Sequence, residues 1–259
     1  MRKLTLWVMA GAAIGAVATS GMSRSRQGDQ ARQMYQRELP DATPIEVGRY
    51  TEAQRVHSRL FVGYPCAPGW TVLKEADGVR GKDDMVGLVA GPGAIVRERV
   101  ETPEEVIGQL TDASDAIVLG VVTGKASQVT ADGSFLFTDY RLSVRDVIKT
   151  SVGAASASIG SIITVTHPGG KVLVNGVIIK ATDRDSLPLP SNGHEMLLFL
   201  KFVPETGAYK LTEYRGAFEL EGKEVHPLTD QAPDRDIGMH RQRLLNAVRD
   251  RGALVRASS

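Results

Sequence analysis

The chain has 259 residues, of which 42% are apolar and 24% are charged, and this balance excludes wholesale disorder, a polytopic membrane protein and a collagen-like fibre. Lys and Arg number 31 and Asp and Glu number 30, which gives a formal net charge of +1. The overall charge therefore gives no reason to expect a nucleic acid or an acidic substrate as partner.

The N-terminus has the residue order of a secretory signal. Met1-Arg2-Lys3 is a short basic start, Leu4 to Val17 is apolar or small throughout, and Ala16-Val17-Ala18 is an A-x-A pattern. This order predicts a signal peptide over residues 1–18. The apolar run is shorter than the roughly 20 residues that cross a bilayer, but an uncleaved N-terminal anchor is the alternative. Both interpretations place the rest of the chain outside the cytoplasm, in the periplasm or in the medium.

The first hundred residues contain little regular pattern beyond this signal. Residues 19–60 are polar and predict a linker or a loosely attached extension. Residues 61–100 hold short apolar runs cut by Gly and Pro, such as Met85 to Ala90, and predict an irregular segment with short strands. The single cysteine, Cys66, cannot form an intrachain disulfide and is interpreted as a small buried residue, with intermolecular pairing or a reactive thiol as alternatives.

A helix and a series of strands are predicted over residues 101–228. Thr102-Pro103-Glu104-Glu105 combines a capping threonine, a proline at the first helical position and a glutamate at the third, which predicts a helix start. Ala116 to Val122 is a continuous apolar run typical of a buried strand. Asn175-Gly176 lies between two apolar runs and is typical of a two-residue type I′ hairpin. Glu195 to Val203 is apolar on both alternating sets and predicts a central strand.

The alternation of apolar residues changes phase within the predicted strand at residues 135–144. Its apolar residues occupy odd positions up to Phe137 and even positions from Tyr140 to Val144. A strand that keeps one face inward through such a change needs an extra residue, so we expect a β-bulge near Thr138-Asp139-Tyr140. Bulges bend strands and let a small sheet close into a barrel.

Residues 229–259 predict a C-terminal amphipathic helix and tail. Ile237, Leu244, Leu245 and Val248 share one helical face, and arginines populate the rest. A basic amphipathic helix can lie on anionic lipid. Docking on the core with a solvated arginine face is the interpretation that this pattern favours.

The chain resembles the OB-like barrels of netrin-type and tissue-inhibitor-of-metalloproteinase-like domains, and uncharacterised bacterial exported proteins with that layout, in the runs Ser114–Val122, Leu142–Lys149, Ile163–Val165 and Gly193–Leu200. The resemblance covers about residues 114–228. It implies a mainly-β fold with a small OB-like barrel, closed or partly open, flanked by short helices at both ends. It also implies a binding role. The animal inhibitors bind the protease zinc through an N-terminal cysteine and are held by disulfides, which this chain lacks, so protease inhibition does not carry over.

Motifs for metal or cofactor chemistry are absent from the sequence. His194-Glu195 does not continue as H-E-x-x-H. His167, His194 and His226 stand at predicted strand ends and could converge as zinc ligands, but scattered loop histidines are the commoner case. Asp183-Arg184-Asp185 offers oxygens to calcium without the glycine and glutamate of an EF-hand. No metal and no cofactor is expected.

Nucleophilic catalysis and nucleic-acid binding are likewise not favoured. Ser134 or Ser191 could act with His167 or His194, but Gly-x-Ser-x-Gly is absent. Phe135, Phe137 and Tyr140 could stack on bases, but their alternation is better explained as core, so no nucleic acid is expected.

The sequence therefore predicts an exported, non-enzymatic β-barrel that binds another envelope or extracellular protein. The candidate binding residues are His167, Asp183, Asp185 and His194, near the loops 151–160 and 183–193, because small barrels bind through one face and their loops. Membrane contact is expected only through an uncleaved N-terminus or the basic C-terminal helix. The alternative is an exported hydrolase-type enzyme or metal-binding protein built from barrel-loop histidines, which would need His167 and His194 beside a carboxylate in one cleft.

Overall fold

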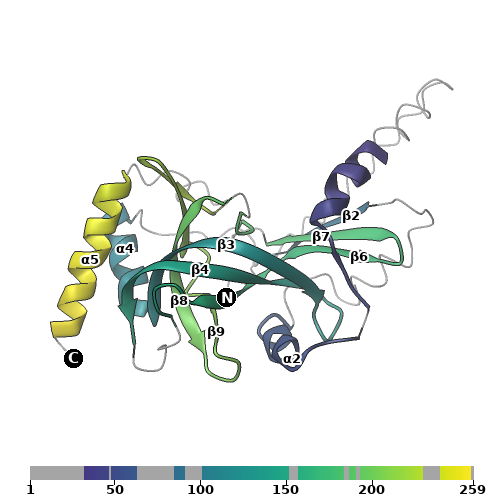
Figure 1. The fold of residues 1–259 in the computed structure, drawn as a ribbon, viewed down its shortest axis with the longest axis horizontal. Helices are drawn as coiled ribbons and strands as arrows, with labels where there is room; N and C mark the ends of the chain where they lie inside the picture. Colours follow the sequence, from purple (N-terminus) through teal and green to yellow (C-terminus); the bar gives the residue numbers. More distant parts are fainter. Residues whose placement is uncertain are drawn as a thin grey trace, which may run out of the picture.

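A computed structural model describes residues 32–46, 48–62, 85–90, 101–151, 157–183, 187–190, 193–229 and 240–257. Strand residues in two β-sheets outnumber helical residues in this part of the chain, which confirms the predicted mainly-β fold (Figure 1). The predicted signal peptide, Cys66, Asp185 and Ser191 lie outside the described residues.

The larger sheet closes on itself. Five strands pair in a ring, in the order β3 (Ala116–Val129), β4 (Leu136–Thr150), β5 (Ile162–Pro168), β9 (Ala208–Leu211) and β8 (Glu195–Val203), which returns to β3. All neighbours are antiparallel except β5 and β9. If the five barrel strands are numbered 1 to 5 along the chain, their order around the ring is 1-2-3-5-4, which is the order of an OB-type barrel. The predicted small barrel is therefore confirmed, and β10 (Ala217–Glu221) and β11 (Glu224–Pro227) extend it beyond β8.

The smaller sheet is made of segments that lie far apart in the sequence. Its order is β1 (Thr43–Pro44), β6 (Gly170–Val174), β7 (Val177–Asp183) and β2 (Met85–Ala90). The β6–β7 turn has positive φ at both Asn175 (52°) and Gly176 (85°), as the predicted type I′ hairpin requires. This hairpin falls between two barrel strands in the sequence but leaves the ring. It lies at the end of the molecule opposite the C-terminal helix (Figure 1).

The predicted bulge at residues 138–140 is wrong. Pairing between β3 and β4 is regular from Val129↔Leu136 to Gly124↔Arg141, and β4 pairs regularly with β5 from Phe137 to Ser143. The register shifts of the β3–β4 pair lie elsewhere, between Ile117/Val118, Leu119/Gly120 and Val122/Gly124.

The change of phase has another cause, which is that β4 is covered on both faces here. Tyr140 and Leu142 face the barrel interior, whereas Phe137 faces outwards. The Phe137 ring stacks on Phe61 at 6.0 Å between centroids, so a side chain on the outer face is also fully buried. A distant segment of the chain supplies this cover, which local periodicity does not reveal.

Two helices cover one end of the barrel. α4 (Pro103–Ala113) begins as predicted, because Thr102 Oγ1 accepts from the Glu105 N–H at 3.3 Å and the Glu105 carboxylate accepts from the Thr102 N–H at 2.9 Å. α5 (Arg241–Ala257) buries Leu244, Leu245 and Val248 against the α4 side of the core.

Four arginines of α5 are paired with carboxylates. The pairs are Arg241 with Glu195, Arg243 with Glu104, Arg249 with Asp146 and Arg251 with Asp112. The helix is thus docked on the core, as its pattern favoured. No helix in the described ranges is long and apolar enough to cross a membrane.

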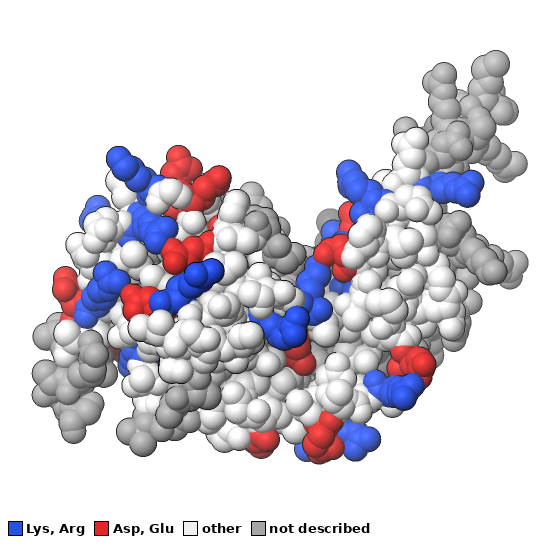
Figure 2. Space-filling model, viewed as in Figure 1, with Lys and Arg blue, Asp and Glu red and all other residues white. Residues whose placement is uncertain are grey.

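Part of the predicted linker is packed on the rest of the fold. Residues 32–38 form a helix that continues into η1 (Leu39–Asp41), and α2 (Glu52–Arg59) follows. Tyr35, His57, Ser58 and Phe61 are buried. Polar composition suggested a loose extension, whereas a few well-placed side chains attach the described part of this segment to both sheets. The surface is hollowed between two lobes, and Lys and Arg side chains gather near the middle (Figure 2).

Candidate functional site

The structure does not bring the predicted site histidines together. Thr138 pairs with His167 on one side and with Ser127 on the other, whereas Glu195, next to His194, pairs with Val121. Ser127 lies six residues further along β3 than Val121, a distance of about 20 Å. His167 and His194 therefore belong to different levels of the barrel and cannot share one site.

His167 is an interior residue. It is 1% exposed, its Nδ1 donates to the Pro168 carbonyl at 2.7 Å, and its ring meets Tyr140 edge-on at 6.2 Å. Burial lowers the pKa of His167 to about 4, although the carbonyl of Pro168 opposes this shift. The ring is thus a neutral part of the core at ordinary pH.

The other predicted residues are also separate. His194 contacts the Glu219 carboxylate, and His226 lies near Glu224, 3.4 Å from its carboxylate. Asp183 is 4% exposed at the end of β7 in the smaller sheet. Ser134 donates to Asp132 at 2.8 Å within the β3–β4 turn. Among the described residues no group of three or more His, Cys, Asp or Glu side chains could hold a metal ion.

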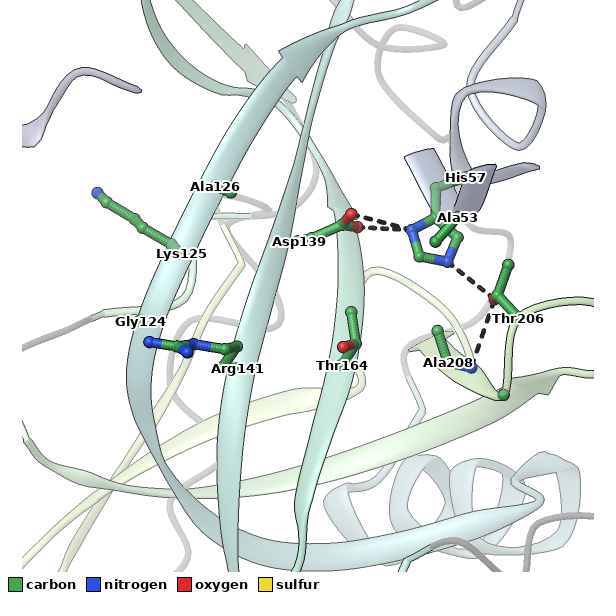
Figure 3. Close-up of a pocket in the computed structure, with 11 residues that line it drawn as sticks. Ala53, His57, Gly124, Lys125, Ala126, Asp139, Arg141, Thr164, Thr206 and Ala208 are labelled. Atoms are coloured by element: carbon green, nitrogen blue, oxygen red, sulfur yellow. Dashed lines mark hydrogen bonds and ion pairs between the residues drawn. The ribbon is translucent and has the colours of Figure 1, made fainter. Parts of the chain in front are cut away.

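A cleft of about 470 Å³ lies instead on the outer face of the barrel and is called the outer cleft (Figure 3). Strands β3, β4 and β5 contribute Lys125, Arg141 and Thr164. Helix α2 and the turn between β8 and β9 contribute His57 and Thr206. In the barrel's own order, the first three strands and the turn between the fourth and fifth form this site.

His57 connects three of these elements. Its Nδ1 lies 2.8 and 3.0 Å from the two carboxylate oxygens of Asp139, and its Nε2 lies 2.9 Å from Thr206 Oγ1. The ring is 1% exposed. Because a carboxylate can only accept, Nδ1 carries a proton, and in the neutral ring this leaves the lone pair of Nε2 directed at the Thr206 hydroxyl. Figure 3 shows the three side chains in one line, which we call the Asp139–His57–Thr206 relay.

Local sequence explains how α2 presents His57. Thr51 Oγ1 accepts from the Gln54 N–H at 3.2 Å, and the Gln54 side chain accepts from the Thr51 N–H at 2.9 Å, which is a capping box. The next residue after His57, Ser58, accepts from the Ala131 N–H at 2.7 Å in the β3–β4 turn. Together with Phe61 on Phe137, these contacts fix the helix across the outer face of β4.

The opposite end of the cleft is basic. Arg141 is exposed and lies flat over Gly124, where a Cβ would stand 2.9 Å from its Nη2 atom. Only glycine leaves room for the guanidinium in this position. Arg141 is not one of the arginines that form ion pairs within the described residues. In Figure 3 it lies on the side of β4 away from His57.

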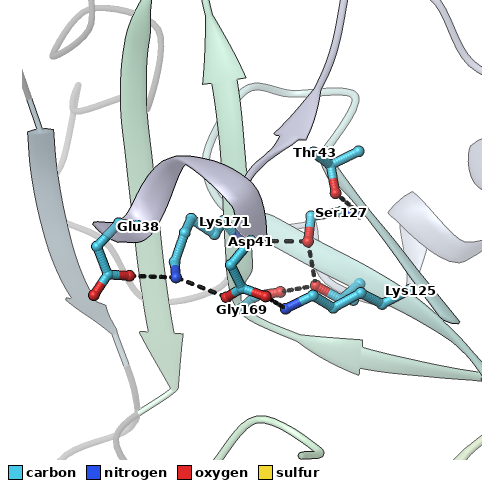
Figure 4. A network of polar contacts seen from close by, with 8 residues as sticks. Glu38, Asp41, Thr43, Lys125, Ser127, Gly169 and Lys171 are labelled. Carbon is cyan, nitrogen blue, oxygen red and sulfur yellow. Dashed lines mark hydrogen bonds and ion pairs between the residues drawn. The ribbon is translucent and has the colours of Figure 1, made fainter. Parts of the chain in front are cut away.

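Lys125, the second cation, is by contrast part of a polar network (Figure 4). Asp41 accepts from both Lys125 and Lys171, and Glu38 also accepts from Lys171. Burial opposes ionisation of Asp41, but the two lysine hydrogen bonds outweigh it and lower the pKa of Asp41. The hydrogen bond from Lys171 likewise lowers the pKa of Glu38. Since the network neutralises Lys125, Arg141 is the remaining cation of the cleft, and the carboxylate of its lining, Asp139, is bonded to His57 at the other end.

Sequence reasoning missed the residues of the outer cleft. Asp139 attracted attention only as part of an expected bulge, Arg141 lies in the same predicted strand, and no catalytic motif includes Thr206. The available signal was Thr51-Glu52-Ala53-Gln54, which has the spacing of a capping box and predicts a helix through His57.

No protein-family model matches the chain, and no curated protein matches it significantly. Function is therefore argued from the cleft itself.

Proposed function

We propose that the protein is an exported binding module whose outer cleft takes an acidic group of another envelope or extracellular protein. The observation that carries this proposal is Arg141, an exposed guanidinium seated on Gly124 at one end of a cleft on the barrel's outer face. OB-type barrels bind their ligands through this face and the turn between the fourth and fifth strands.

The groups around Arg141 suit a carboxylate. A guanidinium binds carboxylates through two parallel hydrogen bonds. Thr164, on the neighbouring strand, adds a hydroxyl in the same cleft. A volume of about 470 Å³ accommodates one or two side chains of a partner rather than a whole domain.

The aromatic residues do not support a nucleic-acid ligand. Phe135 and Phe137 are 0% exposed and Tyr140 is 2% exposed, so these rings form core, as their alternation indicated. Base stacking needs exposed rings on the binding face. Export rests on the N-terminal signal, and N-terminal sequencing of the protein from cells should give a chain beginning at Thr19.

An oligoglutamate peptide tests the proposal, with chemical shifts of the backbone amides followed during titration at low salt. The shifts should centre on Gly124, Arg141 and Thr164. Arg141→Gln should weaken binding by about tenfold or more. Arg145→Gln removes an exposed arginine of the same strand and should leave the affinity unchanged. Equal weakening by both variants, or shifts away from the outer cleft, would contradict the proposal.

A further inference from the structure

The contacts of His57 do more than attach α2 to the barrel. The hydrogen bond of Ser58 and the ring contact of Phe61 already attach this helix to the barrel. His57 additionally places its Nε2 atom 2.9 Å from a hydroxyl oxygen, with a carboxylate oxygen 2.8 Å from Nδ1 on the other side of the ring. A hydroxyl, a base within hydrogen-bond reach and a third group that orients the base form the structural signature of an activated nucleophile.

The Thr206 hydroxyl is open to the outer cleft. Thr206 is half-buried in the turn after β8, and its neighbours in the cleft, Gly207 and Ala208, are small. A Cβ added at Gly207 would meet no atom within 4 Å outside residues 206–208, so the cleft is open at this glycine. The Ala208 N–H lies 3.4 Å from Thr206 Oγ1 and helps to orient it. A carbonyl carbon can therefore approach the oxygen from the cleft.

We propose that the outer cleft hydrolyses carboxylic esters, with Thr206 as nucleophile, His57 as general base and Asp139 as the positioning residue for His57. Substrates that carry an acidic group are favoured because Arg141 lies at the other end of the cleft. This preference rests on the proposed function, whereas the hydrolytic step does not.

The reaction consumes water and leaves the protein unchanged. The Thr206 oxygen bonds to the carbonyl carbon while its proton passes to His57 Nε2. The bond between that carbon and the alcohol oxygen breaks, and His57 returns the proton to the departing alkoxide. Water then attacks the acyl-threonine through the same base, which releases a carboxylic acid and restores the Thr206 hydroxyl.

The first test is acetylation of the full chain by 4-nitrophenyl acetate, located by mass spectrometry after rapid acid quenching. The expected product is one acetyl group on Thr206. Hydroxylamine should remove it, because it cleaves an ester but not the amide that a lysine would form. An acetyl group found only on lysines, in protein whose circular dichroism is that of the folded chain, overturns the proposal.

Variants separate chemistry from structure. Thr206→Val keeps the shape of the side chain and should lower the rate of ester cleavage by about 100-fold or more, whereas Thr206→Ser should retain it. Thr150→Val removes an exposed hydroxyl at the end of β4, outside the cleft, and should have no effect. His57→Gln keeps polar contacts but cannot take the proton, so it should abolish acetylation. Unchanged cleavage in Thr206→Val overturns the proposal.

The two functions fail differently. Thr206→Val should bind oligoglutamate as the wild type does, because Arg141 is unaltered. If ester cleavage is absent while binding maps to Arg141, the hydrolytic role is wrong and the binding role stands. If cleavage depends on Thr206 but Arg141→Gln changes neither binding nor rate, only the acidic preference is wrong.

Discussion

Two equally buried histidines lie on opposite sides of the barrel wall. His167 lies on the same face of β5 as the core residue Val165, and its Nδ1 donates to a backbone carbonyl. His57 lies outside, held between a carboxylate and a hydroxyl. Both are 1% exposed. Burial makes His167 a neutral ring of the core. The ring of His57 is equally buried, but its two partners orient it as a base towards Thr206. The comparison teaches that the partners of a buried histidine, and not its burial, decide what it can do.

The largest expected effect concerns the packing that holds His57 in place. Phe137→Ala removes the ring under Phe61 and should lower the free energy of unfolding by about 3–5 kcal/mol, as measured by urea denaturation. Because α2 loses its apolar contact, the segment 52–62 should also become sensitive to protease. Leu142→Ala, on the inner face, should cost about 2–5 kcal/mol without this local cleavage. Equal protease sensitivity in both variants would contradict the two-sided packing.

The acid stability of the protein should report on His167. Its folded pKa of about 4 lies below the ordinary value of 6.5, so the unfolded chain binds the extra proton first. The contribution of the neutral His167 ring to the free energy of unfolding is fully present above about pH 6.5. It is lost as the pH falls towards 4, and the total loss is about 3 kcal/mol. His167→Asn should flatten this dependence, measured by denaturation between these pH values, whereas the exposed control His240→Asn should not. A slope unaltered in His167→Asn would show that other groups cause it.

A smaller effect is expected from the carboxylate behind His57. Asp139→Asn replaces a charged acceptor by a neutral amide and should cost about 1–3 kcal/mol of stability. Hydrogen exchange of the α2 amides should accelerate, while the acid dependence due to His167 stays as it is. Unchanged exchange in α2 would mean that His57 does not depend on Asp139.

The smallest effect concerns Thr166, which is the cross-strand partner of Asp139. Its hydroxyl oxygen is buried and has no hydrogen-bond partner among the described residues. Thr166→Val should therefore raise the free energy of unfolding by about 1 kcal/mol, since it removes an unsatisfied polar group at constant shape. Thr138→Val is the matched control, because that hydroxyl bonds Ser127 and Gly169 and its loss should destabilise. A loss of stability in Thr166→Val would argue for an undetected partner.

Much of the fold could be predicted because its signals are local. Thr102 to Glu105, Asn175-Gly176 and the doubly apolar run Glu195 to Val203 each specify an element within a few residues, and all three form as expected. Even so, the hairpin after Val174 leaves the ring, because its partners come from residues 43–44 and 85–90. Which sheet the hairpin joins is therefore visible only in the folded structure.

The outer cleft could not be predicted, because its residues are separated by long stretches of chain. Asp139 lies 82 residues after His57, and Thr206 lies 149 residues after it. The same separation produced the mistaken bulge, since Phe137 is buried by Phe61, which lies 76 residues earlier in the chain. The periodicity of apolar residues indicates that a side chain is buried, but it does not show which segment of the chain buries it.

The most direct test of this account is the tautomer of His57, read from two-bond ¹H–¹⁵N correlations of the imidazole. The account predicts a protonated Nδ1 with a strongly downfield proton, an unprotonated Nε2, and loss of that downfield signal in Asp139→Asn. A proton on Nε2 in the neutral ring would point the donor at Thr206 and leave no lone pair for its hydroxyl. That result would contradict both the relay and the hydrolytic role drawn from it.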